Sequence, residues 1–168
     1  VDCYITVAHR AESLGSHMAS SEIGSMSYVV CAAPSYIERF GRPKTIEALS
    51  DHNCIIHEGW RSPRLWRFHR RGKEVAVNVS GSFSTNHALV LEQAVLAGQG
   101  IGRIPTYAAS PYIKSKRLVV LFQNVVTWGQ VVAAYFPNGP QSARLKAYLL
   151  YLQAEVTGRS REFQTAVE

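Results

Sequence analysis

Two continuous apolar runs, YVVCAA at 28–33 and VVAAYF at 131–136, constrain the fold of this chain more than any other feature. Each has the length and composition of a strand that is buried on both faces, which is typical of a parallel sheet covered by helices. Strand-like and helix-like segments alternate between the two runs and form a complete α/β set. The pattern therefore predicts an α/β fold with a largely parallel sheet, in which one lobe is inserted into another and two strands cross between them.

The remaining segments carry signals for individual elements. Trp66 and Phe68 alternate with Arg67 and His69 before a hairpin turn, which predicts two half-buried antiparallel strands. Serine and glycine throughout 9–27 predict a loop. The other predicted elements are strands at 2–8, 54–57, 101–104 and 118–122, a helix at 35–40 capped by Ser35, short helices at 43–50 and 107–113, a helix at 86–97, and a last helix at 142–156 with a core stripe of Leu145, Leu149, Leu152 and Val156, ended by Gly158.

The charge balance points to anionic partners or to a solvated surface. Lys and Arg number 18 against 12 Asp and Glu, a net charge of +6. Much of the excess lies in RSPRLWRFHRRGK at 61–73, where basic residues interleave with aromatic ones. Such a segment could bind nucleic acid by phosphate contact and stacking, but a hairpin with a buried aromatic face and a solvated basic face explains it equally well. We favour the solvated face.

The sequence lacks the residue patterns that several kinds of chemistry require. There is no Gly-x-Ser-x-Gly elbow, and the two aspartates, Asp2 and Asp51, are far apart in sequence. The three cysteines lie in apolar runs without a Cys-x-x-Cys pair, which excludes a zinc ribbon or thioredoxin motif and favours buried, reduced thiols. The six histidines have no metal-chelating spacing. We therefore expect no enzyme activity, no metal site and no cofactor.

Ser84, Thr85 and Asn86 form the most promising functional element. Their hydroxyl and amide groups precede the predicted 86–97 helix, whose free N–H groups and dipole favour an anion such as a carboxylate. Plain capping of the helix is the alternative, and the two interpretations are compatible.

Several motifs together resemble the effector-binding domain of LysR-type transcriptional regulators. CAAPSYIERFGRP at 31–43 and LSDHNCI at 49–55 resemble the family's "A-S-P-x-Y-L…G-x-P" and "L-x-x-H-x-C", and LEQAVLAGQGIGRIP at 91–105 resembles its "A-x-x-G-x-G-I-x-x-L-P". Trp66 to Phe68, VSGSFSTN at 79–86 and RLVVLF at 117–122 also fit. The motifs are individually weak, but their order and spacing over residues 2–157 are specific.

The resemblance implies two α/β lobes, like those of a type 2 periplasmic binding protein, with a small-molecule effector in the cleft between them. Carried over, residues 1–32 and 131–157 form the first lobe, 33–130 the second, and 158–168 a frayed tail. The implied hinge residues are Cys31, Ala32, Ala33, Val132, Ala133 and Ala134. The implied effector-binding residues are His9, Ser84, Thr85, Asn86, Arg103 and Ile104.

The same resemblance implies the partners. The effector is expected to be a small carboxylate or aromatic acid, and the chain is expected to form a cytoplasmic homo-oligomer through its first lobe. DNA would be bound only by a winged-helix domain that these residues do not include. Two strand–helix units that usually open the family's domain have no counterpart here, and Thr6 stands where the family has an arginine. The first lobe is therefore expected to be incomplete.

Two other function classes remain open at this stage. A solute-binding protein of a transport system shares the fold, but the free cysteines and the lack of a signal peptide in this sequence count against it. An enzyme on the same fold is disfavoured by the scarcity of aspartate.

No apolar stretch is long enough to span a membrane.

Overall fold

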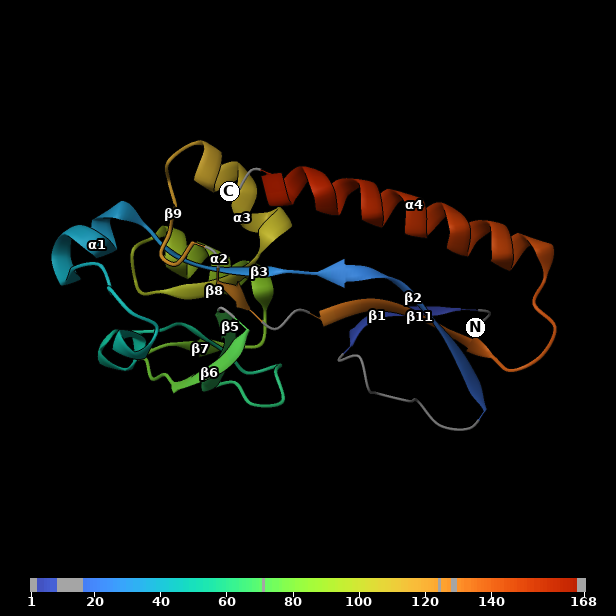
Figure 1. Ribbon diagram of the computed structural model, residues 1–168, viewed down its shortest axis with the longest axis horizontal. Helices are drawn as coiled ribbons and strands as arrows, with labels where there is room; N and C mark the ends of the chain where they lie inside the picture. Colours follow the sequence, from blue (N-terminus) through green and yellow to red (C-terminus); the bar gives the residue numbers. More distant parts are fainter. Residues whose placement is uncertain (1–2, 9–16, 71, 124, 128–129, 166–168) are drawn as a thin grey trace. The chain divides into compact units, whose positions relative to one another are not determined.

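The computed structural model describes residues 3–8, 17–70, 72–123, 125–127 and 130–165 (Figure 1). The chain divides into two compact units. Unit 1 comprises Val1–Met26 and Gly129–Thr165, and unit 2 comprises Ser27–Trp128. One unit is thus inserted into the other. The division falls a few residues before each expected boundary, so the strand at 28–32 belongs to unit 2.

Unit 1 is a three-stranded antiparallel sheet packed against one long helix. The strand order is β1 (Tyr4–Ala8), β11 (Gln130–Pro137) and β2 (Met18–Met26), and the helix is α4 (Ala143–Thr165). The predicted stripe of α4 is confirmed, because Leu145, Leu149, Leu152 and Val156 all pack in the core of this unit with Ile23, Ala134 and Phe136.

A bulge in β2 brings the helix and the sheet into close contact. Val132 pairs with Gly24 and Ala133 with Glu22, which leaves Ile23 as an extra residue whose side chain is buried. A Cβ atom at Gly24 would lie 2.6 Å from Cγ1 of Val156. Glycine at this position therefore allows α4 to approach β2 closely.

Unit 2 contains several small sheets with helices. β3 (Tyr28–Ala32) lies between β8 (Gly102–Pro105) and β9 (Val119–Val120), and β5 (Leu65–Arg70) lies between β6 (Lys73–Asn78) and β10 (Val126–Thr127). β4 (Ile56–His57) pairs with β7 (Ser84–Thr85). The helices are α1 (Pro34–Phe40), the 3-10 helix η1 (Glu47–Asp51), α2 (Ala88–Leu96) and α3 (Thr106–Lys114). Two buried clusters form its core.

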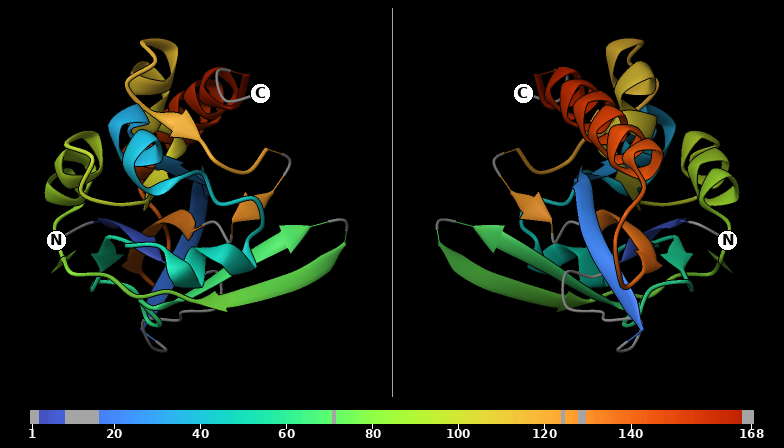
Figure 2. Two further views of the ribbon diagram at one scale, coloured as in Figure 1. Left: turned by 90° about the vertical axis from the view of Figure 1, so that its left-hand side faces the viewer. Right: turned by 90° about the vertical axis from the view of Figure 1, so that its right-hand side faces the viewer.

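The hairpin of β5 and β6, the long pair of strands in Figure 2, has the predicted two faces. Trp66 and Phe68 are both fully buried, opposite Val77 and Val75. Arg67 lies on the exposed face, where it pairs with Glu74. The alternation of aromatic and basic residues is therefore explained by burial of one face of this ribbon.

The expectation of a largely parallel sheet was wrong. Between the named strands of the described residues, only β4 and β7 run parallel, with isolated parallel bridges from Asn53 to Ser80 and from Cys54 to Ile101. The apolar runs become β3 and β11, which have antiparallel neighbours. Burial on both faces makes a strand apolar whatever its direction, so composition alone does not determine strand direction.

Three local predictions also need correction. Residues 18–26, predicted as loop, form β2, because pairing with β11 overrides their weak strand propensity. Gly158 does not end α4, which continues to Thr165 through good helix formers such as Arg and Glu. Ser35 does not cap α1, because the helix begins at Pro34 with Ala33 as its N-cap.

Candidate functional site

A half-buried arginine surrounded by aromatic rings lies inside unit 2. Arg103 belongs to β8 and pairs with Val30 of β3. Its guanidinium carbon lies 3.6 Å from the ring centroid of Trp60, and 5.7 and 5.9 Å from those of Tyr28 and Trp66. Tyr28 and Trp60 also contact each other edge to face, at 5.5 Å. The cation is therefore held against aromatic rings, which attract it through their quadrupoles.

In the part of the chain that the structure describes, no acidic side chain balances the charge of Arg103. Its Nε atom is buried and has no hydrogen-bond partner among these residues. No carboxylate among the described residues pairs with Arg103, whereas Arg64 and Arg67 pair with Glu58 and Glu74. Burial lowers the pKa of Arg103 to about 10, although Tyr28 opposes the shift. Charged groups that are removed from water are normally paired with an opposite charge. The guanidinium of Arg103 has no such partner among the described residues.

His57 contacts the same aromatic ring as Arg103. The imidazole stacks on Trp60 with ring centroids 5.3 Å apart and planes 22° apart. The backbone N–H of Gly59 donates to Nδ1 of His57 over 3.1 Å. Burial lowers the pKa of His57, and the charges of Arg103 and His87 add to this effect, while a hydrogen bond with the residue's own backbone and the charge of Glu58 oppose it. The neutral imidazole is therefore the favoured form.

The predicted Thr85 lies next to His57. The two residues are partners in the parallel pairing of β4 with β7, and the N–H of Glu58 donates to the carbonyl oxygen of Thr85 over 2.9 Å. The Oγ1 atom of Thr85 accepts a hydrogen bond from the N–H of His87 over 3.1 Å. The pairing of β4 with β7 therefore brings Thr85 to the cluster that contains Arg103.

The predicted capping role of Ser84, Thr85 and Asn86 was wrong. Helix α2 begins only at Ala88, with His87 as its N-cap and no side-chain cap. Ser84 and Thr85 form β7, because they pair with β4, and the Ser84 and Asn86 side chains are exposed. These residues lead from a strand into a helix, but their side chains do not hold its first turn.

The other predicted site and hinge residues are placed as follows. The side chain of Ile104 is buried and packs in the core cluster with Leu91 and Val95. His9 lies outside the described residues. Cys31, Ala32 and Ala33 lie at the end of β3 and the start of α1, and Val132, Ala133 and Ala134 lie within β11. Their hinge role stays a prediction.

Three aromatic residues of this cluster were missed by the sequence reasoning. Trp60 lies in the polar segment after β4, where the pattern carries no periodicity, and Tyr28 read simply as part of an apolar strand. His57 was considered only as a metal ligand. A tryptophan among turn residues was the available signal, because so large a side chain rarely stays in a polar loop without a partner.

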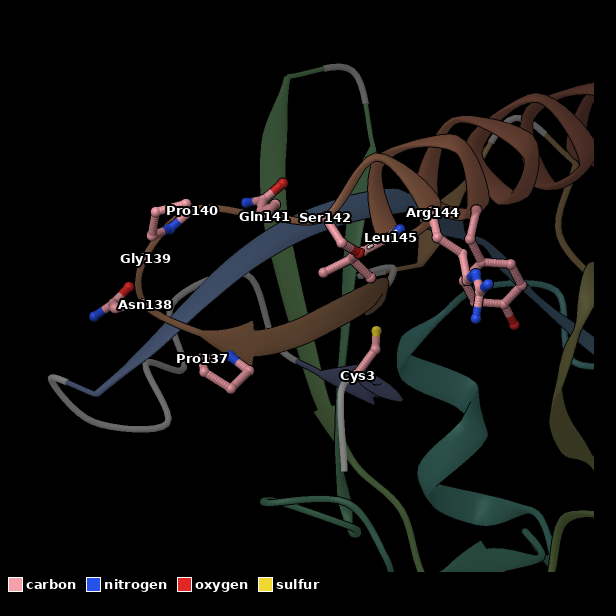
Figure 3. A pocket seen from close by; sticks show the side chains of 10 residues that line it. Cys3, Pro137, Asn138, Gly139, Pro140, Gln141, Ser142, Arg144 and Leu145 are labelled. Atoms are coloured by element: carbon pink, nitrogen blue, oxygen red, sulfur yellow. Dashed lines mark hydrogen bonds between the residues drawn. The ribbon is translucent and has the colours of Figure 1, made fainter.

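A separate hollow lies in unit 1 (Figure 3). It has a volume of about 900 Å³ and lies beside the 137–142 turn and the first residues of α4. Cys3, Arg144 and Tyr148 also line it. None of the predicted site residues takes part. Elsewhere, no group of side chains in the described residues could hold a metal ion, and no helix there is long and apolar enough to cross a membrane.

Comparison with known proteins identifies the family. Residues 1–157 match the family model of the LysR substrate binding domain. The HTH-type transcriptional activator TtdR of Escherichia coli K12 is 26% identical over 127 residues, which are 75% of this chain and 41% of the relative. The chain thus spans less than half the length of that relative.

Solved structures have the same fold. The regulatory domain of AphB from Vibrio vulnificus matches with a TM-score of 0.72 and 21% identity, over 92% of this chain and 75% of that one. The regulatory domain of CrgA, a LysR-type regulator from Neisseria meningitidis, matches with a TM-score of 0.74 and 20% identity, over the same shares. Members of this family are transcriptional regulators and not enzymes. With a family model matched from residue 1 to residue 157, this chain belongs to the LysR substrate-binding domain family.

Proposed function

We propose that this chain is the effector-sensing part of a LysR-type regulator, and that unit 2 binds a small carboxylate or aromatic acid at Arg103. A single observation carries the proposal. The half-buried guanidinium of Arg103 lies among aromatic rings, its buried Nε has no acceptor among the described residues, and no carboxylate there pairs with it. An anionic ligand would supply the missing counter-charge.

The chemistry of the cluster favours a carboxylate over other ligands. A guanidinium presents its donors in a fork that matches the two oxygens of a carboxylate, and such pairs are strong where water is excluded. Trp60, Tyr28 and Trp66 surround the cation with ring faces and edges, which suits a ligand with a planar or aromatic body. A cationic ligand would be repelled by Arg103.

The Nε atom is also buried, so a ligand that reaches it must displace part of its cover. Trp60 is the ring nearest the guanidinium and lies outside any helix or strand. Ligand binding therefore favours a different arrangement of this segment from the one without ligand. Such a difference in affinity between two conformations is what an effector needs in order to act as a signal. The expected position of the effector between the lobes stays a prediction.

The proposal extends to the partners of the intact regulator. We infer that unit 1 mediates self-association, because β1 is an edge strand with Tyr4, Ile5 and Val7 exposed, and α4 exposes Leu150 and Tyr151. DNA would be bound by a winged-helix domain outside this chain, which implies a cytoplasmic protein.

Calorimetric titration with benzoate tests the effector site. Benzoate supplies a carboxylate on an aromatic ring, and benzamide is its neutral counterpart of the same shape. We expect the wild-type chain to bind benzoate and not benzamide. Arg103→Gln is expected to weaken benzoate binding by about 1.5–3 kcal/mol, the value of a hydrogen bond to a charged group.

Arg67→Gln is the matched control. It removes one arginine from the exposed face of β5 and should leave the affinity for benzoate unchanged. Circular dichroism verifies that both variants are folded. If a panel of aromatic and aliphatic carboxylates gives no heat of binding with the folded wild-type chain, the anion site is wrong. Equal affinity for benzoate and benzamide would also contradict it.

A further inference from the structure

We propose that anion binding at Arg103 is coupled to proton uptake by His57, so that the site binds its effector more tightly at acidic pH. This inference rests on the proposed effector site. It concerns a different residue, and it makes a prediction about pH that the presence of an anion site alone does not require.

The geometry connects the two groups through one aromatic residue. The guanidinium of Arg103 lies over the Trp60 ring at 3.6 Å, and the His57 ring stacks on the same indole at 5.3 Å between centroids. The field of the guanidinium reaches the imidazole, since Arg103 is among the groups that lower the pKa of His57. Two groups that can both be cationic therefore lie against the same tryptophan ring.

Among the described residues, the charged groups that act on His57 are Arg103, His87 and Glu58, and a hydrogen bond with its own backbone also favours the imidazolium. Arg103 of β8 and His87, just before α2, disfavour the imidazolium, and Glu58, next to His57 in the chain, favours it. Glu58 is itself held by Arg64, 3.7 Å away, and both side chains are well exposed. Thr85, the β7 partner of His57, contributes no charge. The balance without a ligand therefore favours the neutral ring.

The turn after β4 reinforces the neutral form. The N–H of Gly59 donates to Nδ1 of His57, and an Nδ1 atom that accepts a hydrogen bond carries no proton. A Cβ atom at residue 59 would lie 2.8 Å from Cε1 of the ring, so glycine allows the ring to lie this close to the turn. Forming the imidazolium puts a proton on Nδ1, which ends this hydrogen bond and loosens the turn that leads to Trp60.

A bound anion reverses the electrostatic balance. It neutralises the field of Arg103 and places a negative charge near His57, so the imidazolium becomes favourable and the pKa of His57 rises. The coupling is reciprocal, because a ligand that promotes protonation is bound more tightly by the protonated site. Affinity then increases as pH falls through the His57 pKa of the complex and levels off below the pKa of the free protein.

Titration with benzoate over pH 7.5 to 5.5 tests this coupling, because benzoate stays ionised throughout. We expect the Kd to fall with pH, by about tenfold for each unit by which binding raises the His57 pKa. Calorimetry in two buffers of different ionisation enthalpy should show net proton uptake on binding. His57→Gln should bind with a Kd that is independent of pH. His17→Gln, which replaces an exposed histidine of unit 1, should behave like the wild type.

A second measurement needs no ligand. The Cε1–H signal of His57 in NMR spectra, assigned by its loss in His57→Gln, gives the pKa of this ring directly. Arg103→Gln should raise that pKa in the absence of any anion, because it removes a neighbouring positive charge.

The outcomes separate the two proposals. Benzoate binding with the same Kd at every pH, or wild-type pH dependence in His57→Gln, overturns the coupling and leaves the effector site in place. No binding of benzoate or any other carboxylate overturns the effector site and the coupling with it. An unchanged pKa of His57 in folded Arg103→Gln overturns the coupling whatever the ligand does.

Discussion

Unit 2 buries its apolar residues far more thoroughly than unit 1. In unit 2, two clusters of buried side chains form the core, and Trp66 and Phe68 are completely enclosed. In unit 1, the buried cluster contains four residues, and Tyr4, Ile5 and Val7 of an edge strand remain exposed, as do Leu150 and Tyr151 of α4. Unit 2 therefore has the core it needs to support a site, whereas unit 1 presents surfaces that suit contact with another chain.

The two units also differ in the environment of their candidate binding regions. The candidate site places a half-buried cation among the aromatic rings of unit 2. The hollow of unit 1 is open and lies beside a turn. We infer that sensing is the task of unit 2 and association the task of unit 1, and three measurements test this division.

The largest expected effect comes from opening the core of unit 2. Phe68→Ala removes a fully buried ring of the hairpin from the core of unit 2. We expect the free energy of unfolding to fall by about 3–5 kcal/mol. Tyr148→Ala is the control in unit 1, where the residue is 47% exposed and is not among those proposed for association, and it should change stability much less. Urea denaturation followed by circular dichroism measures both. Similar losses in the two variants would contradict the contrast between the units.

An intermediate effect is expected from placing a charge on the edge of unit 1. Val7→Lys puts an ammonium group on the exposed strand β1, where charge discourages pairing with another chain. We expect self-association to weaken by about tenfold or more, equivalent to about 1.4 kcal/mol. Sedimentation velocity over a range of concentrations measures this.

Val90→Lys is the matched control for Val7→Lys. It changes an exposed valine on α2 in unit 2 and should leave association intact. A wild-type chain that stays monomeric at tens of micromolar would show that unit 1 does not mediate association.

The smallest chemical response is expected from the cysteines of unit 2. Burial raises the pKa of both Cys31 and Cys54 to about 12, with Glu92 adding to the effect at Cys31. Only about one thiol in ten thousand is ionised at pH 8 when its pKa is 12, and the thiolate is the reactive form. Iodoacetamide should therefore label only Cys3, which is partly exposed in unit 1.

Mass spectrometry of the peptides measures the labelling, and Cys3→Ser should abolish it. Rapid modification of Cys31 or Cys54 in the folded protein would show that the core of unit 2 opens more readily than its burial indicates. Urea should expose both thiols together if that core unfolds cooperatively.

Much of the site could not be predicted from the sequence. Thr85 and Arg103 were named through the family resemblance, and the structure places both near His57. The reason first given for Thr85, capping of a helix, was wrong, because the strand pairing of β7 moves the start of α2 to Ala88. Trp60 and Tyr28 were missed, since no local pattern relates either residue to Arg103.

Local periodicity determined the elements whose partners lie nearby. The alternation in 65–70 predicted both faces of the hairpin, and the stripe of α4 predicted which face of that helix packs. These features depend on spacing along the chain, which the sequence records directly.

Tertiary structure decided the rest. Residues 18–26 are polar and small, and they form a strand only because β11 supplies hydrogen-bond partners from more than one hundred positions away. Strand direction, likewise, depends on the path of the chain between strands and not on their composition. The environment of Arg103 also depends on tertiary structure. The aromatic rings that exclude water from its Nε come from distant segments of the chain. No pattern of neighbouring residues in the sequence predicts that these segments fold around it.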